Sequence, residues 1–153
     1  MTSERDPAIQ ELFDRAAIHD VIMRYCHGID QRDMDLVRSC YIPDAYDDHG
    51  RFKGTGIDNI IAFFVAALKP YSATMHFIGN ELIEVHGDTA DSEAYCVAYH
   101  RTVNGEETRD IAVGLRYVDK FVRRDGRWLI AERVVKPIWS RNDLMVPPPV
   151  GQR

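Results

Sequence analysis

The first third of the chain carries apolar side chains at three- and four-residue steps, the spacing of one helix face. The clearest run comprises Ile18, Val21, Ile22, Tyr25, Cys26 and Ile29. A second stripe just before it, at Ile9, Leu12, Phe13 and Ala16, is slightly out of phase, which predicts a break near Ala17. Gly28 lies where the pattern runs out, so we expect it to act as a stop signal.

Two shorter helices are predicted downstream of this long helical region. One spans residues 33–40, with Met34 and Val37 facing inward. The other runs from about Gly56 to Leu68, where the following Lys-Pro pair ends it. Between them, residues 41–50 are rich in turn-forming residues and leave room for one short strand at their centre.

Beyond Tyr71 the apolar pattern changes to a period of two, which indicates strands. The predicted strands cover residues 74–85, with a bend at Gly79-Asn80, and residues 89–103, 108–123 and 127–138. Helices followed by long antiparallel strands predict an α+β domain. We expect a cone-shaped, curved antiparallel sheet, an α+β barrel, with the N-terminal helices packed over its open face. Such a cone has one natural pocket.

Composition narrows the class of protein. A length of 153 residues fits a single domain, predicted over residues 1–145, with an extended Pro-rich tail at 146–153. The net charge of -5 and the lack of a basic stripe disfavour nucleic acid and anionic membranes as partners. No apolar run approaches the ~20 residues that span a bilayer. The widely spaced Cys26, Cys40 and Cys96, after a polar N-terminus, predict reduced thiols in a cytoplasmic protein.

Asp30 and His76 are the strongest candidates for chemistry. A carboxylate that orients an imidazole produces a general base that works near neutral pH. Each residue also has a plainer interpretation, Asp30 as a cap or turn residue and His76 as a hydrogen-bonded structural residue. A metal site at Asp47, Asp48 and His49 is disfavoured, because adjacent side chains diverge on a strand and a metal needs converging ligands.

Three segments carry a resemblance to a known family. They are Tyr25 to Asp33 at the end of the long helix, His76-Phe-Ile-Gly79, and the closing strand Asp125-Gly-Arg-Trp-Leu-Ile130. In this order and spacing they resemble the SnoaL-like branch of the nuclear transport factor two superfamily. The resemblance covers about Ile9 to Ile138.

This resemblance implies a lyase of the dehydratase or dehydrohalogenase type, or an isomerase, that works without a cofactor on a small, mostly apolar, cyclic substrate. Scytalone dehydratase, hexachlorocyclohexane dehydrochlorinase and bile-acid dehydratase share an Asp-His dyad at the positions of Asp30 and His76. His76 is then the base and Asp30 its orienting group. His100 and Tyr25 lie where relatives place a second pocket histidine and a proton-donating tyrosine.

Four further residues are expected to contact the substrate. His49 lies where scytalone dehydratase has a pocket tyrosine, and Lys136 lies near an arginine of bile-acid dehydratase, so both depart from the enzymes they resemble. Phe77 follows the base. Ala98 shares a strand face with His100, where small side chains leave space for a ligand.

Two other functions compete with the enzyme hypothesis. The same cone serves elsewhere as a non-catalytic module for ligand binding or partner docking, in which the dyad would be a structural pair. It also occurs as the small subunit of ring-hydroxylating oxygenases, which does not need the dyad. Whichever function holds, the apolar outer face of a half-open sheet must be covered, which predicts a homo-oligomer. The resemblance favours a trimer over a dimer.

Overall fold

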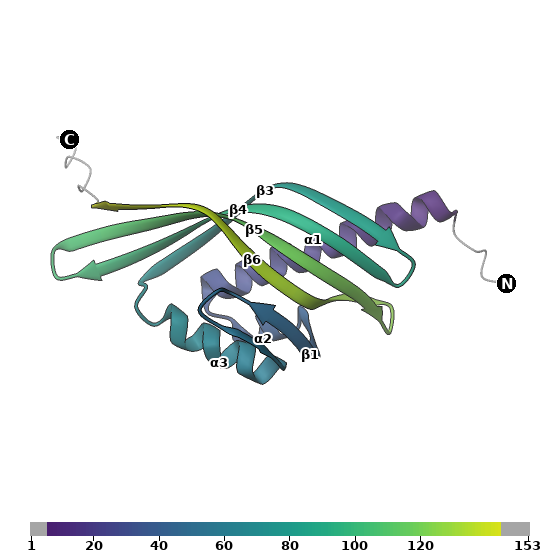
Figure 1. Cartoon of the computed structure of the whole chain (residues 1–153), viewed down its shortest axis with the longest axis horizontal. Coiled ribbons are helices and arrows are strands. Elements are labelled where there is room, and N and C mark those ends of the chain that lie inside the picture. The colour runs from purple at the N-terminus through teal and green to yellow at the C-terminus, as the bar shows by residue number, and fades with distance from the viewer. Residues whose placement is uncertain (1–5, 145–153) are drawn as a thin grey trace, which may run out of the picture.

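The computed structural model describes residues 6–144, which form three helices and one sheet. The elements in chain order are α1 (Pro7–Gln31), α2 (Met34–Arg38), β1 (Tyr41–Asp48), β2 (Lys53–Thr55), α3 (Ile57–Leu68), β3 (Ala73–His86), β4 (Thr89–Asn104), β5 (Glu107–Arg124) and β6 (Arg127–Leu144). In Figure 1, α1 runs along one face of the long strands, while α2 and α3 lie beside β1. The predicted Pro-rich tail lies outside the described residues.

The strands form one open, curved sheet in the order β2-β1-β6-β5-β4-β3. The four long strands pair antiparallel, as their alternating pattern predicts. β1 joins this meander by pairing parallel to β6, so the sheet is mixed and not antiparallel throughout. The short strand β2, which the sequence pattern did not predict, pairs with β1. The α+β cone with N-terminal helices is thereby confirmed.

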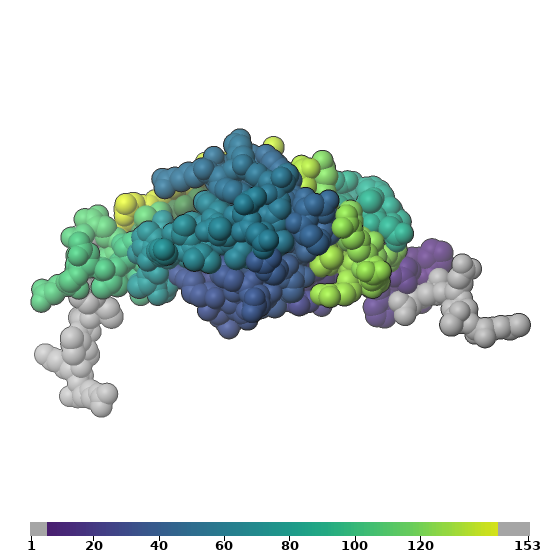
Figure 2. All heavy atoms as spheres, turned by 90° about the horizontal axis from the view of Figure 1, so that it is seen from below, coloured from purple at the N-terminus to yellow at the C-terminus, as the bar shows by residue number. Residues whose placement is uncertain are grey.

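The helices cover a single face of the sheet, which we call the inner face. Tyr25 of α1 meets Tyr117 of β5 edge to face, with ring centroids 5.8 Å apart. Seen from below, the helices and β1 form the bulk of the molecule, and the ends of the long strands reach out on both sides (Figure 2). The opposite, outer face of the sheet has no helix from residues 6–144 upon it.

The long helix differs from the prediction at both ends. α1 is continuous through Ala17. Its first apolar stripe is exposed, with Leu12 68% exposed, so these side chains need not face the sheet and the helix need not break to turn them inward. The helix also runs past Gly28 to Gln31, and Arg32 ends it in the left-handed conformation. Gly28 has a packing role instead, since a Cβ there would lie 2.7 Å from Val37 Cγ2.

The strand register has two informative irregularities. β3 shifts register between Ile78 and Glu81, which confirms the bend predicted at Gly79-Asn80. β6 runs to Leu144 and not only to Ile138, because Pro137 lies beside a register shift where a missing N–H is tolerated.

Two further sequence predictions concern the cysteines and membrane-spanning segments. The side chains of Cys26, Cys40 and Cys96 are buried free thiols. Within residues 6–144, no helix has both the length and the apolar content needed to cross a membrane.

Candidate functional site

Asp30 and His76 meet at the edge of the sheet. The carboxylate accepts a hydrogen bond from His76 Nδ1 at 2.7 Å and a second from the His76 backbone N–H at 2.9 Å. The His76 side chain is 7% exposed and that of Asp30 is 22% exposed. Burial by itself would raise the pKa of Asp30, but the hydrogen bonds from His76 outweigh it and the pKa is lowered. An ionised carboxylate on Nδ1 leaves the Nε2 lone pair free to accept a proton.

The end of α1 delivers Asp30 to this position. The Arg32 guanidinium donates to the Ile29 carbonyl at 2.8 Å and to Thr74 Oγ1 at 2.7 Å, so one side chain ties the last turn of α1 to β3. Free carbonyls at a helix end need such donors. The Asp30–His76 dyad therefore depends on a contact between α1 and β3, which are more than forty residues apart in the sequence.

His100 on β4 lies beside the dyad. Its ring meets the His76 ring edge to face, with centroids 5.9 Å apart, and tilts against Tyr71 at 4.8 Å. Burial, and then the neighbouring His76, lower the pKa of His100. His100 is thus held as a neutral imidazole, which can donate or accept a hydrogen bond near neutral pH.

A cavity of about 610 Å³ reaches the dyad from the side of the sheet edge. It lies between the last turns of α1 and strand β3. Besides Asp30 and His76, its walls include Met23, Cys26, Met75, Phe77 and Ile78, with His27 and Gln31 among the polar groups. The walls are mostly apolar, as expected for a site that holds a small apolar molecule.

A second polar group lies deeper, around Tyr25. The Tyr25 hydroxyl is 3.3 Å from His49 Nε2, and His49 Nδ1 hydrogen bonds with Asp47. Tyr41 donates to the other oxygen of Asp47 at 3.1 Å. Asp48 turns away and pairs with Lys53 at 3.0 Å, so Asp47, Asp48 and His49 do not converge.

The largest fully buried side chain is Arg133, which sequence reasoning did not single out. It forms two hydrogen bonds with Asp119, at 2.8 and 2.6 Å, and its guanidinium packs against the rings of both Tyr25 and Tyr117, at 4.1 and 4.2 Å from their centroids. Its Nη1 has no hydrogen-bond partner among the described residues. Arg133 could have been found from the two-residue alternation of side chains along β5 and β6. This alternation and the pairing of the two strands put Asp119 and Arg133 opposite each other on the inner face.

Two buried thiols lie within range of the charges of both Asp30 and Arg133. Burial raises the pKa of Cys96 to about 11, and the charges of both Arg133 and Asp30 act on it. Burial likewise raises the pKa of Cys26, on which the same two charges act. Tyr25 and Asp30 are five residues apart on α1, which is about 7.5 Å along the helix axis. Five residues also turn the helix by about 140°, so the two side chains leave α1 in different directions, and the link between the two polar groups is the pair of thiols on which both charges act.

The remaining predicted contacts divide between the two faces. Ala98 pairs with His76 across β3 and β4 and is 1% exposed, so it lies beside the dyad but does not line the cavity. Phe77 is 64% exposed and lines the cavity that reaches His76. Lys136 is exposed and pairs with Arg116, which lies opposite Tyr95 on the outer face. The structure does not bring Lys136 to the dyad.

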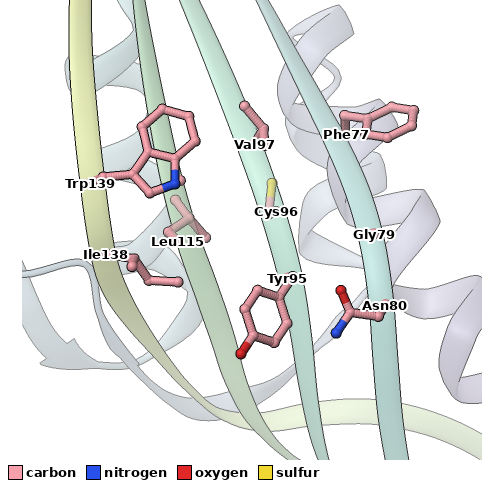
Figure 3. Close-up of a pocket in the computed structure, with 10 residues that line it drawn as sticks. Phe77, Gly79, Asn80, Tyr95, Cys96, Val97, Leu115, Ile138 and Trp139 are labelled. Atoms are coloured by element: carbon pink, nitrogen blue, oxygen red, sulfur yellow. The ribbon is translucent and has the colours of Figure 1, made fainter.

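The outer face has a hollow of its own, about 230 Å³ in volume (Figure 3). Phe77, Tyr95, Val97, Ile138 and Trp139 surround it. Trp139 lies against Gly114, where an added Cβ would be 2.2 Å from the indole Cε2. Four of the five side chains are at least 40% exposed, and together they form an apolar patch on the convex side of the sheet.

Comparisons with known proteins identify the family and the fold of this chain. The family model of the SnoaL-like domain matches residues 10–134. Uncharacterized proteins of Mycobacterium tuberculosis and Mycobacterium bovis are 34% identical over 131 residues, which is 83% of this chain and 87% of theirs.

Two solved structures share the fold. A putative scytalone dehydratase from Novosphingobium aromaticivorans is 19% identical, with a TM-score of 0.80 over 95% of this chain and 99% of its own. A hexachlorocyclohexane dehydrochlorinase of type 3 from Novosphingobium barchaimii is 21% identical, with a TM-score of 0.80 over 92% of this chain and 99% of its own.

Proposed function

The chain belongs to the SnoaL-like domain family, and from this membership we propose that it is a cofactor-independent lyase or isomerase with an Asp-His general base. The observation that carries the proposal is the double hydrogen bond from His76 to Asp30 beside a cavity. The similarity to a dehydratase and a dehydrochlorinase supports it. A purely structural pair would not need an open cavity next to the imidazole.

His76 acts as the base in this proposal. Asp30 holds the proton on Nδ1, so Nε2 removes a proton from a substrate carbon next to a carbonyl or a leaving group. The imidazolium that forms is stabilised by the adjacent carboxylate, whose lowered pKa keeps it ionised. His100, a neutral neighbour of His76, adds no positive charge that would oppose this step.

The developing negative charge on oxygen needs a donor. Tyr25 and Arg133 are the proposed donors from the deeper group. Arg133 is fully buried and does not line the cavity beside the dyad, but its Nη1 has no hydrogen-bond partner among the described residues, and a buried donor normally finds one, which supports as its partner a substrate oxygen that reaches inward from the cavity. Arg133 thus takes the oxygen-binding role that the resemblance had suggested for Lys136.

The substrate class follows from the cavity walls. Met23, Met75, Phe77 and Ile78 offer apolar and polarisable surface, which suits a small cyclic molecule with few polar groups. We propose that this ring lies with its acidic C–H toward His76.

Exchange of solvent deuterium into a panel of cyclic ketones and hydroxy-ketones tests the proposal, because it detects proton removal before the true substrate is known. Wild-type protein should exchange at least one of them, and His76→Ala should lower that rate by about 100-fold or more. His86→Gln, which changes an exposed histidine at the far end of β3, is the matched control. Equal exchange by wild type and His76→Ala would sink the proposal.

We also propose that the outer face is covered by further copies of the chain, in the trimer that the resemblance implies. The patch around Trp139 supports this, since contiguous exposed apolar surface usually marks an interaction site. Sedimentation equilibrium should give the mass of a trimer for wild type and a monomer for Trp139→Glu. A wild-type monomer would contradict the assembly without bearing on the dyad.

A further inference from the structure

The inner face contains a second carboxylate–imidazole pair. In each pair the carboxylate hydrogen bonds to Nδ1, Asp30 to His76 and Asp47 to His49. The pairs differ at Nε2: His49 Nε2 is 3.3 Å from the Tyr25 hydroxyl, while no hydrogen bond to His76 Nε2 occurs within residues 6–144. Two similar pairs with different surroundings are the arrangement by which one site performs both acid and base chemistry.

Tyr25 on its own is a poor proton donor. Its side chain is 1% exposed, and burial raises the pKa of the phenol well above its ordinary value. A phenolate left in this environment would be costly, so a proton that leaves Tyr25 must be replaced as it goes. His49 is placed to replace it, because its side chain is 18% exposed and reaches from Tyr25 toward solvent.

We propose that Asp47, His49 and Tyr25 form the proton-supplying arm of the same site, in which His49 delivers protons from solvent through the Tyr25 hydroxyl to the substrate oxygen. This inference rests on the proposed function, because it assigns the acid that works opposite the His76 base. Asp47 is fully buried and accepts from both Tyr41 and His49, so it stabilises the charged imidazole.

The proton transfers balance without any added reagent. His49 begins as the imidazolium, with Nδ1–H on Asp47 and Nε2–H on the Tyr25 oxygen. As His76 takes the carbon proton, the Tyr25 O–H bond breaks and its proton goes to the carbonyl or leaving oxygen. The Nε2 proton of His49 then restores the phenol. His49 regains a proton from water and His76 releases one, so the protein is unchanged over the cycle.

Several charged and titratable groups surround His49. β1 contributes Asp47 and Asp48, β2 contributes Lys53 through its pair with Asp48, α1 contributes Tyr25, and β6 contributes Arg133 beside the Tyr25 ring. The α3 side chains packed on the imidazole are the uncharged rings of Phe63 and Phe64. Two carboxylates therefore lie close to the imidazole, and the Arg133 guanidinium already pairs with Asp119.

The pH profile of deuterium exchange into a reactive cyclic ketone tests the relay. Exchange by wild type should fall at alkaline pH as His49 loses its proton. His49→Gln keeps a hydrogen-bonding group near Tyr25 but cannot titrate, so it should lower the rate about 100-fold and abolish the alkaline decline. Asp47→Asn should move the decline to lower pH by more than Asp48→Asn does, because Asp47 bonds the imidazole directly while Asp48 pairs with Lys53. A His49→Gln profile that keeps the wild-type decline overturns the relay.

A second measurement decides the relay if no ketone exchanges, an outcome that would count against the proposed function instead. The ring nitrogens of labelled His49 are followed by NMR against pH in wild type and in Tyr25→Phe. The relay predicts the Nδ1–H tautomer for neutral His49 and a shifted titration in Tyr25→Phe, because the Nε2 partner is lost. An Nε2–H tautomer, or identical titrations, overturns it.

Discussion

Asp30 binds His76 at two points, the ring Nδ1 at 2.7 Å and the backbone N–H at 2.9 Å. The backbone bond fixes where the carboxylate lies along β3, and the ring bond then fixes the orientation of the imidazole. A helix end and an edge strand are thereby joined by the same side chain that orients the proposed base. Both the position of His76 and the choice of the ring nitrogen that carries its proton therefore depend on Asp30.

Replacing Asp30 by Asn should therefore impair His76 with little change in packing. The amide matches the carboxylate in size but presents an N–H that disfavours the Nδ1–H tautomer. We expect His76-dependent deuterium exchange to drop by about 100-fold or more. Asp20→Asn, an exposed change on the same helix, should retain the wild-type rate. Undiminished exchange by Asp30→Asn would show that the carboxylate does not orient the base.

His100 makes stability depend on pH. Burial lowers the pKa of His100 in the folded state, so the unfolded chain binds a proton there first as pH falls through about 6.5. Because the unfolded state then binds more protons, the free energy of unfolding should decrease between about pH 7.5 and about pH 5.5. Urea titrations at both pH values should show a smaller decrease for His100→Gln than for wild type or the His86→Gln control. Equal decreases would contradict the assignment.

The buried Arg133–Asp119 pair should be sensitive to the loss of one partner. Asp119→Asn leaves a guanidinium in a fully buried position without its counter-charge. We expect the free energy of unfolding to drop by about 3–5 kcal/mol, as measured by urea denaturation. Replacing both residues, as Arg133→Met with Asp119→Leu, should recover most of this loss because no charge stays buried. A loss below about 1 kcal/mol for Asp119→Asn alone would contradict this account.

Gly28 should resist even the smallest side chain. Alanine is favoured over glycine inside a helix by about 1 kcal/mol, but its Cβ would lie 2.7 Å from Val37 Cγ2 and force α1 away from α2. We expect Gly28→Ala to destabilise the protein by about 1–3 kcal/mol. In the double variant with Val37→Ala the shortest contact is relieved, while the Asp33 carbonyl oxygen still lies 3.0 Å from the added Cβ, so the two losses should be less than additive. Additive losses in thermal or urea unfolding would place the strain elsewhere.

The sequence pattern predicted the elements where one local period dominates. Four long strands, their turns and the bend at Gly79-Asn80 follow from alternation and glycine placement. The predicted break near Ala17 did not occur, because the first apolar stripe of α1 is exposed and does not pack against the sheet. Strand β2 and the parallel pairing of β1 with β6 were missed, since three residues carry no measurable period and pairing partners are remote in sequence.

The residues of the candidate site also fall into those that the sequence predicted and those that it missed. The pattern of Asp30 and His76, with the motifs around them, was sufficient to predict that the two side chains pair. Arg133 was overlooked because a lone arginine in a strand resembles a solvent-facing residue until its partner Asp119 is known to lie opposite. Lys136, chosen instead, shares the outer face with Arg116. A shift of three residues along a strand changes the face, and bulges make that parity hard to count from sequence.

By itself, the sequence determined which residues are capable of proton chemistry and which segments are helix or strand, because both depend on side-chain type and local spacing. Only the tertiary structure decided that Asp47, His49 and Tyr25 form a second hydrogen-bonded chain and that Arg133 is buried against two tyrosines. These contacts join α1, β1, β5 and β6. Their geometry is set by sheet curvature and helix packing, which no local pattern encodes.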